Sequence, residues 1–192
     1  LSDGWTARDL AAHLVLRERR PDAAAGIIVG PLAGYTRRVQ RGLAERESFG
    51  GLIDAIRNGP PRLSLFGLPG MDERANLVEF FVHHEDIRRG TPGWAERKVT
   101  PELSEALWQR LGMARFVLRK APVGVELVRD DITTSPGQGR VRITAKARTP
   151  VVTVTGAPGE LTLWTSGRRN AAQVRLDGTE AAVHTLASAR WG

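Results

Sequence analysis

Three side chains in the sequence have the types and the spacing from which metal sites are built. Glu79 and His83 are four residues apart, so in a helix a carboxylate and an imidazole project from one face, one turn apart. His13 follows Leu10 by three residues and directly precedes Leu14, which turns its imidazole toward the interior of an earlier helix. A second imidazole from a facing helix would complete a three-ligand site.

The donor types indicate which cation such a site would hold. Two imidazole nitrogens and one carboxylate oxygen suit Zn²⁺, and three protein ligands leave a fourth position for water or substrate, as in catalytic zinc sites. Nitrogen donors disfavour Ca²⁺ and Mg²⁺, whereas Fe²⁺, Ni²⁺ and Mn²⁺ remain open. The spacing alone also allows an ordinary i,i+4 pair of Glu79 and His83, with His13 as a hydrogen-bonded core histidine.

Two acidic residues stand close to the candidate ligands in the sequence. Asp9 lies one turn before His13 and could bond the second ring nitrogen, the usual arrangement around a metal-bound imidazole. An acidic residue in a first helical turn is equally explained by the helix dipole. Asp86 follows His83 by three residues and could play the same part, or it could pair with a nearby arginine.

The other histidines are not expected to bind a metal. On an ideal helix His84 points about 100° away from His83, so we assign it to the surface or to packing. Nothing around His184 points to a site. Core or lid positions are expected for the tryptophans Trp5, Trp164 and Trp191.

The first half of the sequence has the periodicity of helices, and two of them carry the candidate ligands. Thr6 followed by Asp9 predicts the start of the helix that contains His13. Asp72 and Gly90 bound the strongly apolar helix that contains the other two ligands. Further helices are expected at residues 23–29, 35–45, 52–56 and 100–120, with Gly50-Gly51 dividing the second from the third and a loop at 60–70.

After Pro122 the apolar residues alternate with polar ones, which is the period of strands. Strands are expected at residues 123–127, 141–143, 152–154 and 173–176, with a polar loop at 130–139 and helices at 158–166 and 179–189. A helical half followed by a mixed half predicts an α+β protein of two small domains, residues 1–121 and 122–192.

Composition excludes several classes of protein. The formal net charge is +7, yet the basic residues are scattered and no basic stripe is interleaved with aromatics, so nucleic-acid binding is not favoured. No apolar run approaches the roughly 20 residues that a membrane-spanning helix needs. The absence of cysteine excludes disulfides and cysteine nucleophiles, and we expect a cytoplasmic protein.

Two motifs carry a resemblance to a known family. Residues 4–14 read GWTARDLAAHL, and residues 79–86 read EFFVHHED. Together they resemble the mycothiol-dependent maleylpyruvate isomerase family, whose members belong to the DinB-like metal-dependent bundles. In that family a histidine of a Trp-Thr-x-Arg-Asp-x-x-x-His element and a Glu-x-x-x-His pair bind zinc. The resemblance therefore implies His13, Glu79 and His83 as the zinc ligands.

The resemblance also implies a fold. It predicts an N-terminal four-helix bundle, whose usual first helix would precede Leu1 and is expected to be missing from this chain. Residues 159–168 and 174–178 are similar to the smaller sterol-carrier-like α/β domain of the family. In such a fold Arg168 could present its guanidinium to a carboxylate of a cosubstrate or substrate, although a solvated loop arginine is the alternative. His84 beside the expected ligand departs from the family pattern.

The activity that the resemblance implies is thiol chemistry at a divalent metal, most simply Zn²⁺. Mycothiol would be the cosubstrate, a small electrophile the substrate, and the reaction an isomerisation or an S-transfer. Because the chain has no cysteine, the thiol has to come from the cosubstrate. The alternative is a non-catalytic binding module of the same fold that keeps a metal for stability or ligand capture.

Overall fold

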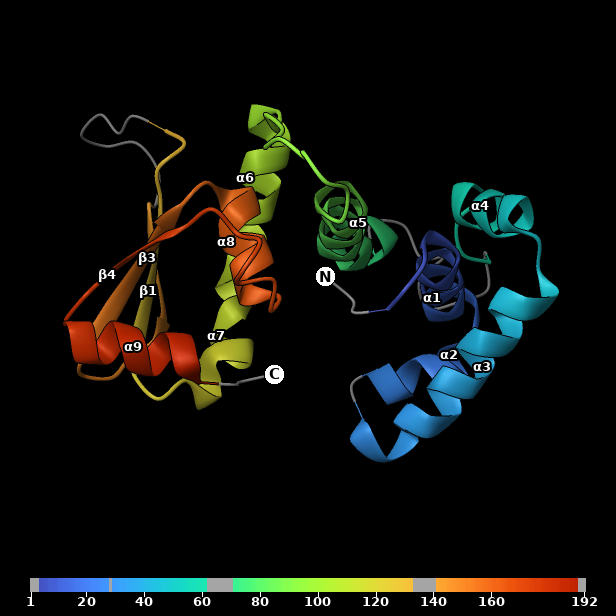
Figure 1. Ribbon diagram of the computed structural model, residues 1–192, viewed down its shortest axis with the longest axis horizontal. Helices are drawn as coiled ribbons and strands as arrows, with labels where there is room; N and C mark the ends of the chain where they lie inside the picture. Colours follow the sequence, from blue (N-terminus) through green and yellow to red (C-terminus); the bar gives the residue numbers. More distant parts are fainter. Residues whose placement is uncertain (1–3, 28, 62–70, 133–140, 190–192) are drawn as a thin grey trace. The chain divides into compact units, whose positions relative to one another are not determined.

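The chain folds as a mixed α+β protein, as the order of periodicities predicts. The computed structural model describes residues 4–27, 29–61, 71–132 and 141–189, with the backbone alone for residues 71–75. The chain divides into two compact units between Ile87 and Arg88, the first helical and the second built on a small sheet (Figure 1). Most of the predicted loop at 60–70 and most of the loop at 130–139 lie outside the described residues.

The N-terminal unit is formed by helices. Its helices are α1 (Ala7–Arg19), α2 (Pro21–Ala24), α3 (Ala33–Arg46), α4 (Phe49–Arg57) and α5 (Met71–Arg89), with 3₁₀ turns at Ala25–Ile27 and Gly30–Leu32. Its apolar cluster joins small and aliphatic side chains of α1, α3 and α4, namely Ala11, Ala12, Val15, Ala44 and Leu52. Helix α5 extends two residues beyond the end of this unit.

Helix α1 begins where its sequence predicts. The Thr6 side chain accepts a hydrogen bond from the Asp9 backbone N–H, and the Asp9 carboxylate accepts one from the Thr6 backbone N–H at 2.8 Å. This capping box satisfies amide donors that have no partner within the helix. Asp9 is therefore used at the helix terminus.

One helix boundary differs from the prediction. Gly50 and Gly51 do not divide two helices but lie in the first turn of α4, and the break falls at Glu47 and Ser48. The Ser48 hydroxyl accepts a hydrogen bond from the Gly51 N–H at 3.0 Å. The cap therefore decides the boundary, because a satisfied N-terminus outweighs the low helix propensity of two glycines.

The C-terminal unit is built around a four-stranded sheet in the order β2-β1-β3-β4. The central pair β1 and β3 is parallel, and both outer pairs are antiparallel. The strands are β1 (Gly124–Arg129), β2 (Arg142–Lys146), β3 (Val151–Gly156) and β4 (Arg175–Asp177). The helices are α6 (Pro101–Arg110), α7 (Ala114–Val117), α8 (Pro158–Thr165) and α9 (Glu180–Ser188), with 3₁₀ turns at Leu111–Met113 and Leu118–Lys120.

The core of this unit explains why the unit begins earlier than residue 122. Side chains that precede the sheet in sequence, such as Trp108, Leu111 and Leu118, are buried in one cluster with Val125 and Val154 of the central strands. The change of periodicity at Pro122 marks a change of secondary structure, whereas the division into compact units lies at residues 87 and 88.

The segment 100–120 is predicted as one helix but is interrupted. Helix α6 starts at the Thr100 cap as expected and ends at Arg110, and short turns surround α7. Phe116, whose apolar side chain we expected on the same face as Leu107 and Leu111, is 51% exposed. The prediction of a continuous amphipathic helix is therefore wrong beyond residue 110.

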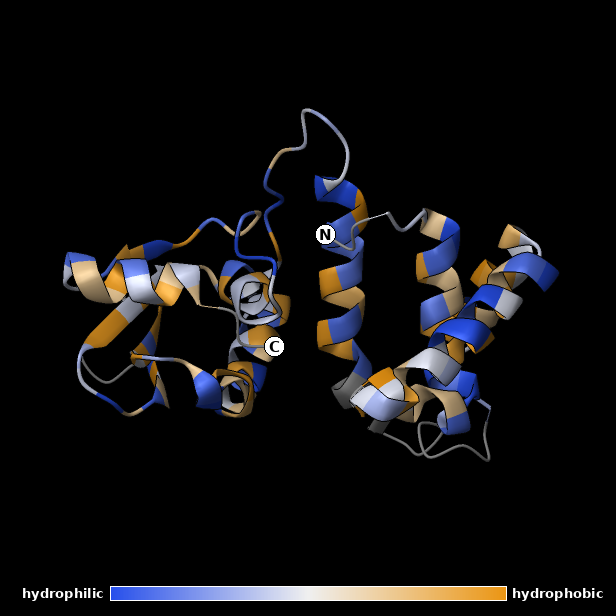
Figure 2. Cartoon of the chain, turned by 60° about the horizontal axis from the view of Figure 1, so that its bottom comes forward, coloured by the Kyte–Doolittle hydropathy of each residue, from blue (hydrophilic) through white to orange (hydrophobic). Residues whose placement is uncertain are grey.

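Hydrophilic and hydrophobic residues are interspersed along the helices (Figure 2). Within the described part of the chain, every helix is too short or too polar to cross a bilayer.

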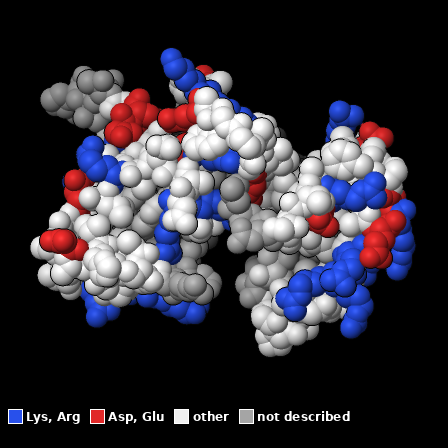
Figure 3. Space-filling model, viewed as in Figure 1, with Lys and Arg blue, Asp and Glu red and all other residues white. Residues whose placement is uncertain are grey.

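Basic side chains gather over α3, with acidic side chains beside them (Figure 3).

Candidate metal centre

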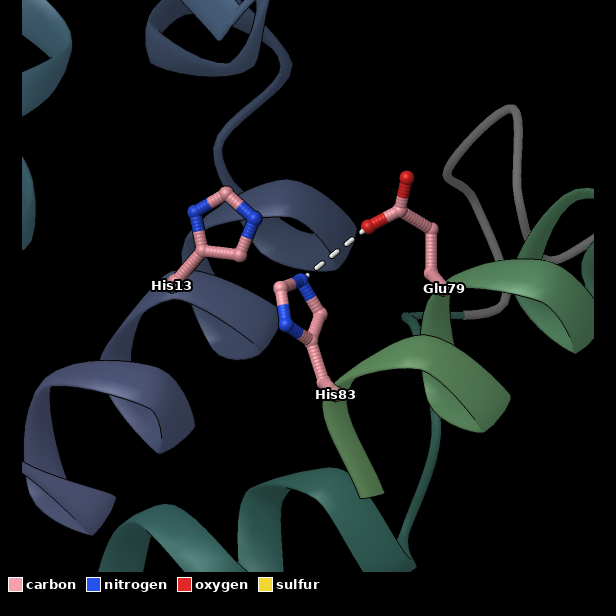
Figure 4. A group of neighbouring side chains, drawn as sticks. All are labelled: His13, Glu79 and His83. Carbon is pink, nitrogen blue, oxygen red and sulfur yellow. Dashed lines mark ion pairs between the residues drawn. The ribbon is translucent and has the colours of Figure 1, made fainter. Parts of the chain in front are cut away.

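The structure brings the three predicted ligands together inside the N-terminal unit. His13 comes from α1, and Glu79 and His83 come from α5, all turned toward one space between the two helices (Figure 4). One donor atom from each residue lies within 4.8 Å of the others. Both imidazoles are buried, whereas the Glu79 side chain is 37% exposed, so the site reaches solvent on the Glu79 side.

The distance between the two α5 donors matches the geometry of a zinc ion. Around a tetrahedral zinc ion with bonds of about 2.1 Å, two ligand atoms lie about 3.4 Å apart. His83 Nε2 and Glu79 Oε2 are 3.3 Å apart. The His13 and His83 rings meet edge to face with centroids 5.3 Å apart, which leaves room for an ion between their nitrogens.

His83 lies between two carboxylates. Its Nδ1 is 3.0 Å from Asp86 Oδ2, and its Nε2 faces Glu79. Because an ionised carboxylate can only accept hydrogen bonds, the contact with Asp86 places a proton on Nδ1. In a neutral ring the Nε2 lone pair then faces another acceptor. A cation between Nε2 and Glu79, either a proton or a metal ion, resolves that repulsion, and Nε2 is the atom that would bind a metal.

His13 is kept neutral by its surroundings. Burial lowers the pKa of His13 below its ordinary value of 6.5, and the neighbouring His83 lowers it further, while the charge of Glu79 and a hydrogen bond with Gln40 oppose the shift. The Trp5 ring lies beside it with centroids 5.3 Å apart. A neutral imidazole has a free lone pair, which is the form that binds a metal.

Glu79 is kept ionised. Its hydrogen bond with His83 lowers the pKa of the Glu79 carboxyl, burial raises it, and the positive charge of Arg17 lowers it again, with a net lowering. A neutral His13 and an ionised Glu79 are the protonation states in which these two side chains bind a divalent cation.

The two acidic neighbours have different roles. Asp86 contacts His83, which was one of the two alternatives predicted from the sequence, and both side chains are buried. Such a carboxylate behind a metal-binding imidazole fixes the orientation and the tautomer of the ring. Asp9 instead belongs to the capping box of α1 with Thr6.

The remaining candidates lie elsewhere. His84 and His184 are exposed, as expected. Arg168, the predicted cosubstrate contact, lies in the C-terminal unit after α8 and donates a hydrogen bond to the Ser166 carbonyl at 2.8 Å. Trp164 is a core residue, Trp5 is 41% exposed beside His13, and Trp191 lies outside the described residues.

Sequence reasoning missed two residues beside the ligands. Arg17 stands four residues after His13, and Asn76 stands three residues before Glu79, so each shares a helix face with a ligand. Arg17 donates a hydrogen bond from Nη1 to Asn76 Oδ1. The same spacing rule that paired Glu79 with His83 would have found both residues.

Comparisons of the chain with protein-family models, with curated proteins and with solved structures found no match. The site therefore has to be interpreted from its own residues.

Proposed function

We propose that the chain is a metal-dependent enzyme that uses a small thiol, with His13, Glu79 and His83 as ligands of a divalent cation, most simply Zn²⁺. The observation that carries the metal site is the meeting of two imidazoles and one carboxylate from two helices, with donor atoms within 4.8 Å. This donor set suits zinc and leaves a coordination position for an outside ligand. The thiol is proposed from the resemblance of residues 4–14 and 79–86. The finer fold that we propose for the N-terminal unit is a DinB-like bundle, with a sterol-carrier-like C-terminal unit.

A thiol is the outside ligand that the proposal assigns to the open position. A bound zinc ion would stabilise a thiolate at neutral pH, which is the nucleophilic form of the cosubstrate. The thiolate sulfur would add to an electrophilic double bond, and the proton that the thiol released would add to the neighbouring carbon. In an isomerase the adduct would rotate about the new carbon–carbon single bond and then lose the thiol and the proton. In a transferase the sulfur–carbon bond would remain. The Glu79 side chain is 37% exposed, so the site is open to solvent next to Glu79.

The second candidate is a binding module that holds the metal without catalysis. The burial of both imidazoles favours it, because a closed and rigid site also suits a structural ion. The partial exposure of Glu79 favours the enzyme, since a structural site would be closed by a fourth protein ligand.

The test is thiol binding at the metal, followed through cobalt. Co²⁺ replaces Zn²⁺ in such sites and gives an absorption band when sulfur binds it. We expect the Co²⁺-loaded protein to develop a sulfur-to-cobalt charge-transfer band on addition of mycothiol, and to convert maleylpyruvate or a related electrophile only when the thiol is present.

The His84→Ala variant is the matched control, because His84 is the exposed neighbour of a ligand on the same helix. It should behave as the wild type in both assays. If the protein binds one equivalent of Co²⁺ but shows no sulfur-to-cobalt band with the thiol, the thiol-enzyme hypothesis is wrong and the binding-module hypothesis stands.

A further inference from the structure

The candidate site depends on the distance between two helices, α1 and α5. His13 belongs to α1, and the other two ligands belong to α5. The apolar cluster of the N-terminal unit joins α1 with α3 and α4 and includes no described side chain of α5. Contacts outside this cluster therefore set the distance between α1 and α5, on which the geometry of the three donors depends.

A buried polar bridge joins the same two helices. Arg17 on α1 donates from Nη1 to Asn76 Oδ1 on α5, and Asn76 Nδ2 donates to Glu18 Oε1 on α1 at 3.1 Å. Asn76 is 2% exposed and Glu18 is 3% exposed. The neutral Asn76 amide therefore accepts a hydrogen bond from the Arg17 cation and donates one to the Glu18 anion, and both charged residues lie on α1.

The bridge lies one turn from the ligands on both helices. Arg17 follows His13 by four residues, and Asn76 precedes Glu79 by three, so on each helix the bridge and the ligand occupy the same face. A shift of α5 by one residue would rotate it by about 100° and move it by about 1.5 Å. Either movement would break both hydrogen bonds and separate the buried Glu18 carboxylate and the partly buried Arg17 guanidinium from the amide that bonds them, which is costly away from water.

We propose that Asn76 is a positioning residue of the metal centre: its two hydrogen bonds to α1 hold α5 in the register at which Glu79 and His83 meet His13. The inference rests on the proposed metal site. Asn76 is not one of the three candidate ligands, so it would act through the placement of the ligands. When the donors are already held in place, metal binding does not have to supply the free energy that brings the two helices together, so the affinity is higher.

The test compares Asn76→Ala with Thr36→Val. Thr36 is 6% exposed in the same unit, and its hydroxyl donates to the Ala23 carbonyl at 2.5 Å, so the control also loses a buried hydrogen bond but lies on α3. Both variants should unfold at a lower temperature than the wild type. Only Asn76→Ala should weaken zinc binding, by at least about tenfold, the lower end for residues that orient metal ligands. Its Co²⁺ spectrum should change as well.

The outcomes separate this inference from the proposed function. Wild-type zinc affinity in Asn76→Ala, or an equal loss in both variants, would overturn the positioning role and leave the metal site standing. Failure of the wild type to bind any divalent metal would sink the proposed function, and hydrogen exchange of the metal-free proteins then decides the role of Asn76. We expect faster exchange of α5 amides in Asn76→Ala than in Thr36→Val, and equal rates would overturn the inference.

Discussion

At the scale of residues, the candidate site is explained by helix spacing and by a few contacts that spacing cannot reveal. The i,i+4 rule predicts that Glu79 and His83 share a face, and they lie 3.3 Å apart. No local rule predicts that His13 would face them, because α1 and α5 are separated by more than fifty residues and meet only through the tertiary fold. The resemblance to a known family supplied that pairing.

Asp86 should control how firmly the metal is held. The Asp86→Asn variant keeps the volume of the side chain but removes the charge that orients and polarises His83. We expect zinc affinity to fall by about tenfold or more, the range found for such carboxylate partners. Competition with a chromophoric chelator measures it. Asp54→Asn, which changes an exposed carboxylate of the same unit, should bind zinc as the wild type does, and an equal loss would argue against the role of Asp86.

The neutral state of His13 has a consequence for stability and pH. Burial lowers its pKa below 6.5, so below that pH the unfolded chain takes up a proton more readily than the folded one. The stability that His13 contributes is therefore complete above about pH 6.5 and is lost as the pH falls through its lower folded value. Urea unfolding of the metal-free protein at about pH 7.5 and about pH 5.5 should show a smaller decrease for His13→Leu than for the wild type. Equal decreases would contradict the assignment.

At the scale of elements, most helices and strands were predictable because their caps and periods are local. The caps at Thr6, Ser48 and Thr100 all accept hydrogen bonds from backbone amides as their positions suggest. The interruption after Arg110 was not predictable, since no local breaker other than Gly112 marks it and Phe116 fits an apolar period. The packing of those turns against the sheet decides the outcome.

The cap of α1 should be measurable by itself. Thr6→Ala removes the hydroxyl that accepts the Asp9 N–H, and we expect a loss of about 1 kcal/mol in the free energy of unfolding, the usual value for such caps. Thr6→Ser keeps the hydroxyl and should recover most of the loss. Urea titration checks both variants, and equal stabilities of the alanine and serine variants would contradict the capping role.

At the scale of the whole molecule, the α+β class follows from the order of periodicities, but the division into units does not. The prediction placed a boundary where helices give way to strands, and the structure divides at residues 87 and 88 because the segment from Trp108 to Leu118 completes the core of the sheet. Periodicity predicts where helices and strands form, but it does not predict which helices pack against the sheet.

The C-terminal unit contains a buried ion pair that should be essential to it. Arg89 donates to both Glu160 carboxylate oxygens, at 3.0 and 2.5 Å, and Glu160 also accepts from the Gln173 N–H. Arg89→Ala should cost about 3–5 kcal/mol, because it leaves a buried carboxylate without its cation. Arg89→Ala combined with Glu160→Ala should cost less than the sum of the single changes. Chemical denaturation of the three variants measures this, and additive losses would contradict the pairing.

The metal content of the purified protein tests whether His13, Glu79 and His83 bind a cation. We expect about one equivalent of zinc per chain in the wild type and in His84→Ala, and loss of the metal in His13→Ala and in His83→Ala, with all variants folded by circular dichroism. Stoichiometric metal that survives in both His13→Ala and His83→Ala would show that the ion is held elsewhere and would refute the proposed site.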